Sequence, residues 1–128
     1  MNFKKETGDR GEDTAVKYLE NLGYSVLDRN YRKPWGEIDV VMKKGGNIHF
    51  VEVKTVHVKT FSNLGFGDSS AEEKVTKEKM ARMKRTIMTY LSEKRIPEDI
   101  DFQIDLVGVY INKDTDEQKI NFWEDIFI

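Results

Sequence analysis

Two apolar, β-branched runs flank the pair Gly45-Gly46, and this pattern predicts a β-hairpin with the two glycines as its turn. Because successive side chains of a strand point to opposite faces, the turn determines which residues share a face. Counting outward from the turn places Lys44 opposite Asn47 and Asp39 opposite Glu52. One face is predicted to carry Glu37, Asp39, Val41, Phe50, Glu52 and Lys54, with Glu37 opposite Lys54. The other face is predicted to carry Ile38, Val40, Met42, His49, Val51 and Val53.

Asp39 and Glu52 form a like-charge pair within strands that are otherwise built from Val, Ile and Phe. Directly opposed like charges destabilise a sheet by about 0.2–1 kcal/mol. The presence of this pair therefore has to be explained by an interaction that compensates for the repulsion. Mg²⁺ prefers oxygen ligands and is commonly held by one or two carboxylates together with waters and substrate phosphates. For a single acidic residue a solvated surface charge is the simpler interpretation. The trio with Lys54 favours a site for Mg²⁺ or Mn²⁺.

The same residues resemble the D…ExK signature of the PD-(D/E)XK nuclease superfamily. The resemblance extends over nearly the whole chain, in the order found in the YraN family of small bacterial proteins, which are regarded as predicted endonucleases distantly related to Holliday junction resolvases. The matching residues are Gly11-Glu12, Asn30-Tyr31-Arg32, Gly36-Glu37-Ile38-Asp39, Phe50-Val51-Glu52-Val53-Lys54, Phe66-Gly67, Val75-Thr76, Lys79, Tyr90-Leu91 and Asp105. The chain departs from the family at Val56, where an Arg is usual, and its end matches only through Phe127.

This resemblance implies a Mg/Mn-dependent endonuclease that hydrolyses phosphodiester bonds of DNA, with branched or structured DNA as a candidate substrate. Asp39 and Glu52 would bind the metal, and the resemblance adds the carbonyl of Val53 as a ligand. Lys54 would hold the attacking water or neutralise charge on the phosphate, and Glu37 would orient Lys54. Glu12 lies at the end of the core-facing row of the first predicted helix. Its spacing fits a first-turn acid favoured by the helix dipole as well as a further carboxylate near the metal, and the resemblance favours the latter.

Along the chain, one helix is predicted before this hairpin and another after it. The expected elements are a helix at Asp9–Leu22, a strand at Tyr24–Asn30, a polar link at Asn30–Trp35, a loop at Thr55–Asp68, a long helix opened by the capping-box signature Ser70–Glu73, and strands at Phe102–Ile111 and Ile120–Trp123. A helix between Lys54 and Phe102 makes a right-handed crossover, which makes the strands on either side of it parallel. The expected architecture is α/β: a mixed central sheet flanked by helices, matching the restriction-endonuclease-like core that the resemblance implies.

Composition sets further limits. A chain of 128 residues predicts one domain over residues 1–128, and the absence of cysteine excludes disulfides and thiolate metal sites. The N-terminus lacks an apolar signal region and no long apolar run follows, so we expect no membrane segment and a cytoplasmic protein. The net charge of −2 is unusual for a nucleic-acid-binding domain. Positive charge is local, and the predicted nucleic-acid contacts are Arg32, Lys33, Lys77 and Lys79.

Three interpretations remain open: a metal-dependent nuclease, a nucleic-acid-binding or assembly protein that keeps the fold with little or no cleavage, and an unrelated acidic α/β module. The resemblance and the apolar Phe122–Ile128 stretch favour a weak or substrate-dependent homodimer. His49 lies on the face opposite Glu52 and is not expected to be a ligand. Trp35 at a turn could stack on a base, but packing over the end of the sheet is favoured.

Overall fold

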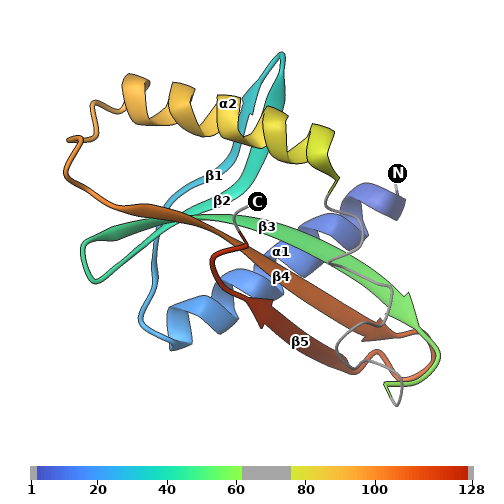
Figure 1. Ribbon diagram of the computed structural model, residues 1–128. Coiled ribbons are helices and arrows are strands. Elements are labelled where there is room, and N and C mark those ends of the chain that lie inside the picture. Colours follow the sequence, from blue (N-terminus) through green and yellow to red (C-terminus); the bar gives the residue numbers. More distant parts are fainter. Residues whose placement is uncertain (1–2, 62–75, 127–128) are drawn as a thin grey trace.

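The computed structural model describes residues 3–61 and 76–126. Within them the chain forms two helices and five strands: α1 (Phe3–Asn21), β1 (Ser25–Lys33), β2 (Gly36–Lys44), β3 (Asn47–Val58), α2 (Lys77–Glu93), β4 (Phe102–Asn112) and β5 (Gln118–Trp123). The strands form one sheet in the order β1-β2-β3-β4-β5 (Figure 1). Only β3 and β4 pair in parallel, through the crossover that contains α2. The predicted mixed sheet flanked by helices is therefore confirmed, and it is compatible with a restriction-endonuclease-like core.

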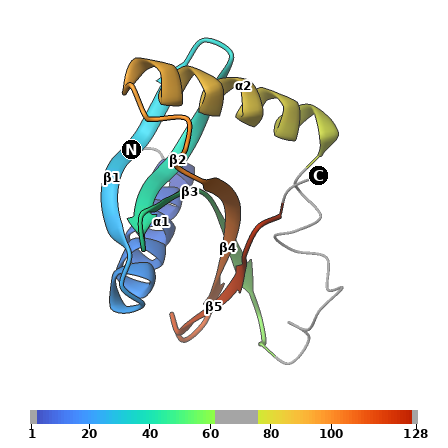
Figure 2. The same cartoon turned by 60° about the vertical axis from the view of Figure 1, so that its left-hand side comes forward.

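The two helices cover opposite faces of the sheet, and each buries its own apolar cluster (Figure 2). Under α1 lie Ala15, Val16, Leu19, Tyr24, Val40, Met42, Val51, Val107, Val109 and Ile111. Under α2 lie Ile38, Val41, Ile48, Phe50, Met80, Met83, Ile87, Tyr90 and Ile104. Strand β4 is buried on both faces, as its run of apolar residues predicted: Val107, Val109 and Ile111 lie in the cluster under α1, and Ile104 lies in the cluster under α2.

The Gly45-Gly46 turn forms as predicted. Both glycines have positive φ, 58° and 85°, which a tight turn between two strands requires and which glycine adopts at little cost. The ladder between β2 and β3 starts at Lys44 opposite Asn47 and keeps the predicted register as far as Val40 opposite Val51. Beyond that pair the ladder ends, one residue short of Asp39 and Glu52.

The predicted alternation of faces fails at Ile38. Its side chain lies in the cluster under α2, together with Val41, whereas strict alternation places it on the α1 face with Val40. Two irregularities coincide at this point: the ladder with β3 has ended, and Asn30 of β1, between the pairs Arg29–Val40 and Tyr31–Ile38, has a left-handed φ of 53°. The end of the ladder opens the end of the sheet at which the acidic residues lie.

Several predicted boundaries shift. The polar link at Asn30–Trp35 is wrong, because β1 continues to Lys33 and only Pro34 and Trp35 turn the chain into β2, with Arg32 opposite Glu37 as an opposite-charge pair. Helix α2 begins at Lys77, and the Thr76 hydroxyl caps it by accepting a hydrogen bond from the Lys79 N–H at 3.1 Å. The predicted loop at Thr55–Asp68 is wrong at its start, because β3 continues to Val58. Residues 62–68 of that loop and the Ser70–Glu73 signature lie outside the described residues. No helix in 3–61 or 76–126 is long and apolar enough to cross a membrane.

Candidate active site

The candidate site lies where β2 leaves β3. In an antiparallel ladder alternate residues exchange backbone hydrogen bonds, so after Val51 the next residue of β3 that faces β2 is Val53. Its N–H finds no backbone acceptor there and donates instead to the Asp39 carboxylate, with 2.8 Å between nitrogen and Oδ2. The N–H and the carbonyl of a strand residue point to the same edge. The Val53 carbonyl therefore faces the same opening as Asp39.

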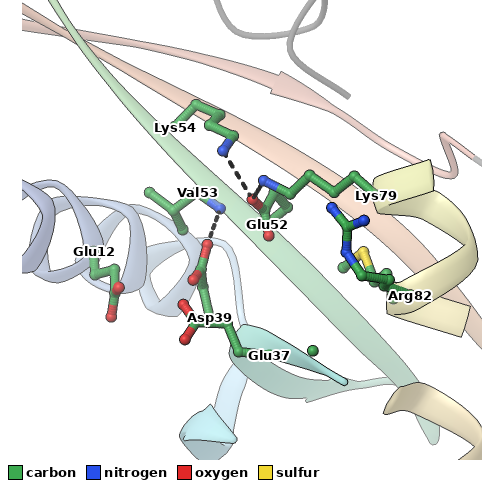
Figure 3. Close-up of a pocket in the computed structure, with 10 residues that line it drawn as sticks. Glu12, Glu37, Asp39, Glu52, Val53, Lys54, Lys79 and Arg82 are labelled. Carbon is green, nitrogen blue, oxygen red and sulfur yellow. Dashed lines mark hydrogen bonds and ion pairs between the residues drawn. The ribbon is translucent and has the colours of Figure 1, made fainter. Parts of the chain in front are cut away.

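This opening is a pocket of about 380 Å³. Residues from both helices and two strands line it: Glu12 from α1; Gly36, Glu37 and Asp39 from β2; Glu52, Val53 and Lys54 from β3; Lys79, Arg82 and Met83 from α2 (Figure 3). The predicted trio Asp39, Glu52 and Lys54 is thus brought together, with Glu12, Glu37 and Lys79 beside it. Arg82 also lines the pocket and was not among the predicted site residues. Its signal was its position one helical turn after Lys79, since residues three apart share a helix face.

Asp39 and Glu52 are almost fully buried, with exposed fractions of 8% and 5%. Burial, followed by the charge of Glu52, raises the pKa of Asp39 to about 8, and the hydrogen bond from Val53 offsets only part of this rise. Within the described part of the chain no lysine or arginine forms an ion pair with Asp39. An ionised Asp39 is therefore unfavourable in the protein alone and would be stabilised by a cation.

Glu52 is neutralised by two lysines. Lys54 Nζ lies 3.2 Å from Glu52 Oε1, and Lys79 donates a hydrogen bond to the same oxygen (Figure 3). Burial lowers the pKa of Lys54, and the contact with Lys79 lowers it further. Burial also acts to lower the pKa of Lys79, but its interactions with Glu52 outweigh that effect and raise it. Of the two lysines, Lys54 therefore releases its proton more readily.

Glu37 does not pair with Lys54, contrary to the prediction. Its carboxylate lies 3.0 Å from the Arg32 Nε across the β1–β2 pairing. The reason is the end of the β2–β3 ladder at Val40, which removes the cross-strand neighbour that the prediction assumed. Glu37 still lines the pocket, and its charge adds a little to the elevated pKa of Asp39.

Glu12 reaches the pocket because α1 approaches the sheet closely. A Cβ at Gly11 would lie 1.8 Å from Thr55 Oγ1, so only glycine allows this distance. Burial raises the pKa of Glu12, and Arg29, 3.5 Å away, partly offsets this, as does Asn30. In residues 3–61 and 76–126 no three His, Asp or Glu side chains form a ready-made metal-binding group. Glu12 thus lines the pocket without joining Asp39 and Glu52 as a preformed third ligand.

The predicted nucleic-acid contacts divide into two groups. Lys79 lies in the pocket and pairs with Glu52, whereas Lys77 is exposed at the first residue of α2. Arg32 and Lys33 lie near the β1–β2 turn and pair with carboxylates, Lys33 at 2.7 Å from Glu93. These four residues lie along the side of the molecule formed by α2 and the β1–β2 turn.

His49 lies away from the pocket, as its strand face predicted. Its Nδ1 is 2.8 Å from the Asp105 carboxylate on β4, where both side chains are buried. Asp105 also accepts hydrogen bonds from Gln103 Nε2 and from the Asp125 N–H, each at 2.8 Å. The YraN-like motif includes Asp105, and the structure places it in a buried polar cluster separate from the carboxylates of the pocket.

Comparison with known proteins identifies relatives along almost the whole chain. The model of a family described as "Uncharacterised protein family UPF0102" matches residues 11–109. A UPF0102 protein of Caldicellulosiruptor saccharolyticus is 36% identical over 124 residues, covering 97% of this chain and 98% of that protein. A relative from Sulfurihydrogenibium is 36% identical over 110 residues, covering 86% and 89% of the two chains. One from Campylobacter hominis is 36% identical over 119 residues, covering 93% and 91%.

Proposed function

The chain belongs to the UPF0102 family, which is the YraN family of the sequence resemblance, and we propose that it is a metal-dependent endonuclease acting on DNA. The observation that carries the proposal is the burial of two neighbouring carboxylates, Asp39 and Glu52, beside Lys54 in one open pocket. Such a group is costly to hold without a cation, as the elevated pKa of Asp39 shows. Groups with strongly shifted pKa values gather at sites that do chemistry.

The donor atoms in the pocket fit Mg²⁺ or Mn²⁺. Among the contacts of the described residues, Oδ2 of Asp39 carries the hydrogen bond from Val53, and Oε1 of Glu52 carries both lysine contacts. The second oxygen of each carboxylate and the Val53 carbonyl are the candidate ligands, and hard divalent cations prefer such oxygen donors. When bound, the metal supplies a water with a lowered pKa, which serves as the nucleophile at neutral pH.

The cationic residues of the pocket supply the rest of the chemistry. Lys54 stands beside Glu52 in the pocket, where it would hold the nucleophilic water or, as an ammonium group, neutralise charge that grows on the phosphate oxygens. Lys79 and Arg82 extend positive charge along α2, where they would position the DNA backbone by its phosphates. Metal binding is thereby assigned to Asp39 and Glu52, the nucleophilic water to Lys54, and the contact with the DNA backbone to Lys79 and Arg82.

A second candidate is a nucleic-acid-binding protein that keeps this pocket but does not cleave. It is favoured by the double contact of Glu52 with Lys54 and Lys79, because these ammonium groups compete with a divalent cation for the carboxylate. The two candidates differ in whether the cation displaces the lysines from Glu52.

The test combines calorimetric titration of Mn²⁺ with cleavage of branched and linear DNA in Mn²⁺. We expect the parent protein to bind Mn²⁺ and to cleave, and Asp39→Asn to lose metal affinity and activity together. Asp114→Asn is the matched control, because this exposed aspartate lies in the turn between β4 and β5, outside the pocket. Mn²⁺ binding that survives Asp39→Asn would contradict the metal site. Metal binding without cleavage of any nucleic acid would leave the second candidate.

A further inference from the structure

A second pocket adjoins the candidate active site at the turn between β1 and β2. Its volume is about 350 Å³, and it is lined by Arg32, Lys33, Pro34, Trp35, Gly36, Glu37 and Arg82. Gly36, Glu37 and Arg82 line both pockets, so the two spaces are neighbours along one surface. We call the second one the hairpin pocket. Whatever occupies it lies directly beside the carboxylates of the active site.

The hairpin pocket has a fixed wall, because the β1–β2 turn rests directly on α2 (Figure 1). A Cβ at Gly36 would lie 2.5 Å from Thr86 Oγ1 and 3.3 Å from the Arg82 carbonyl oxygen. The Thr86 hydroxyl in turn donates a hydrogen bond to that carbonyl at 2.8 Å. The turn and the helix are therefore in contact, and the side chains of Trp35 and Arg82 are presented from adjoining backbones.

Trp35 is the unusual residue of this pocket. The guanidinium carbon of Arg85 lies 4.4 Å from the centre of its ring, within the range of a cation–π contact. Its indole N–H is buried and has no hydrogen-bond acceptor among the described residues. A tryptophan that serves packing usually satisfies its N–H when that group is buried, so this exception calls for another explanation. Apart from the contact with Arg85, the structure describes no polar contact that fixes the indole of Trp35 to the fold.

Positive charge surrounds this indole. Arg82 is exposed, lines both pockets and forms no ion pair with the described residues. Arg32 and Lys33 carry pairs with Glu37 and Glu93 that are open to solvent, and such pairs contribute little and exchange partners readily. An aromatic ring beside exposed arginines is the combination that binds an unpaired base together with its phosphate.

We propose that the hairpin pocket binds one unpaired nucleotide of the substrate strand, with its base on the Trp35 ring and its phosphate at Arg82. The nucleotide neighbours the phosphate that enters the active site, and its identity as DNA rests on the proposed function. A base inside a duplex is stacked on its neighbours and cannot offer its face to a side chain. The chain therefore prefers DNA with unpaired nucleotides, such as single-stranded segments, over blunt duplex.

The test uses the fluorescence of Trp35 in the full chain with Trp123→Phe, which leaves one tryptophan. Trp123 contributes to a separate cluster with Leu106 and Tyr110, so its replacement leaves the hairpin pocket intact. Binding is measured without divalent metal, so that no strand is cut. We expect single-stranded oligothymidylate to quench the fluorescence, and an abasic strand of the same length to bind without quenching. Equal quenching by both strands, or by neither, would overturn the proposal.

Three further variants separate the contribution of the base from that of the phosphate. Trp35→Ala is expected to weaken binding of oligothymidylate about tenfold, the usual scale for losing one stacked base, while binding of blunt duplex stays nearly unchanged. Trp35→Phe, which keeps an aromatic face, should retain most of the affinity and shows that the loss is not one of folding. Arg82→Gln should weaken normal and abasic strands alike. If Trp35→Ala binds single-stranded DNA as tightly as the parent, the base site is wrong.

The outcomes also distinguish this inference from the proposed nuclease activity. Base-dependent quenching in a protein that never cleaves would uphold the hairpin pocket and refute the nuclease. If the protein cleaves DNA, and neither Trp35→Ala nor the presence of unpaired nucleotides changes the rate, the nuclease is supported and the nucleotide site in the hairpin pocket is wrong.

Discussion

Asp39 and Asp105 are buried aspartates of the same sheet, and their surroundings differ completely. Asp105 has an exposed fraction of 0% and holds three partners, His49, Gln103 and the Asp125 N–H, each at 2.8 Å. Asp39 has an exposed fraction of 8%, one hydrogen bond from Val53, and a second carboxylate beside it. The carboxylate of Asp105 thus has three polar partners, whereas that of Asp39 has one hydrogen bond and a neighbour of like charge.

The difference separates a structural role from a chemical one. Asp105 ties β3, β4 and the segment after β5 together through its partners, so its burial stabilises the fold. Asp39 is held where burial and Glu52 oppose its charge, so the ionised form costs stability, and the cation that we propose for this site would offset that cost. The same residue type, at similar burial, is thus assigned to different roles by counting its partners.

The largest effect is expected from Asp105→Ala. The substitution leaves His49, Gln103 and the Asp125 N–H without their common partner, and removing one member of a buried polar or charged group costs about 3–5 kcal/mol. Chemical denaturation followed by circular dichroism measures the loss. Mn²⁺ affinity of the folded fraction should be unchanged. A loss of stability below about 1 kcal/mol would mean that Asp105 is not the structural counterpart of Asp39.

The next effect is expected on turnover from Lys54→Ala. Lys54 contacts Glu52 but is not a proposed ligand, so the variant should keep Mn²⁺ binding while cleavage slows by about two to three orders of magnitude. Paired calorimetry and cleavage of branched DNA give both quantities. Lys43→Ala, at an exposed position of the same hairpin, is the matched control and should cleave like the parent. If Lys54→Ala cleaves DNA as fast as the parent, Lys54 has no catalytic role and serves only as an ion-pair partner of Glu52.

The smallest effect is expected on the stability of the metal-free protein from Asp39→Asn. The folded pKa of Asp39, about 8, lies above its ordinary value of 3.8, so the folded state keeps a proton that the unfolded state has lost between these values. The stability of the parent therefore falls as pH rises from about 4 to 8, and the variant, which cannot ionise, escapes this fall. The stability of the variant relative to the parent should therefore increase from pH 5 to pH 8, and at pH 8 the variant should be the more stable of the two.

Thermal unfolding between pH 5 and pH 8, without divalent metal, measures this gain. Adding Mn²⁺ should stabilise the parent more than the variant, because only the parent keeps both carboxylates for the cation. A variant that is less stable than the parent at pH 8 would show that the unfavourable charge of Asp39 has been overstated.

The sequence predicts the parts of the fold that depend on local pattern. The Gly45-Gly46 turn determines the hairpin register, and the length of chain between Lys54 and Phe102 leads to the parallel pairing of β3 with β4. The end of the ladder at Val40 could not be predicted, because it depends on how β2 divides its pairing between β1 and β3. The incorrect pairing of Glu37 with Lys54 follows from that one unknown.

Contacts between elements that are far apart in the chain could not be predicted from the sequence either. Lys79 meets Glu52 only because α2 lies near β3, and spacing along a helix does not show which strand its side chains reach. Asp105 was visible in the family motif, but its partner His49 lies 56 residues away, so nothing local indicated a buried pair.

The contact of Gly36 with α2 has a consequence for protein design. Copying Asp39, Glu52, Lys54 and Lys79 onto another α/β scaffold would transfer the charges but not the spacing between hairpin and helix. That spacing is set by a backbone that touches Thr86 and Arg82 with no side chain between them. A scaffold with alanine at this point would hold its helix farther from the strand, and Lys79 and Arg82 would move away with it. The smallest unit that could be transplanted is therefore strands β1 to β3 together with α2, including the contact at Gly36.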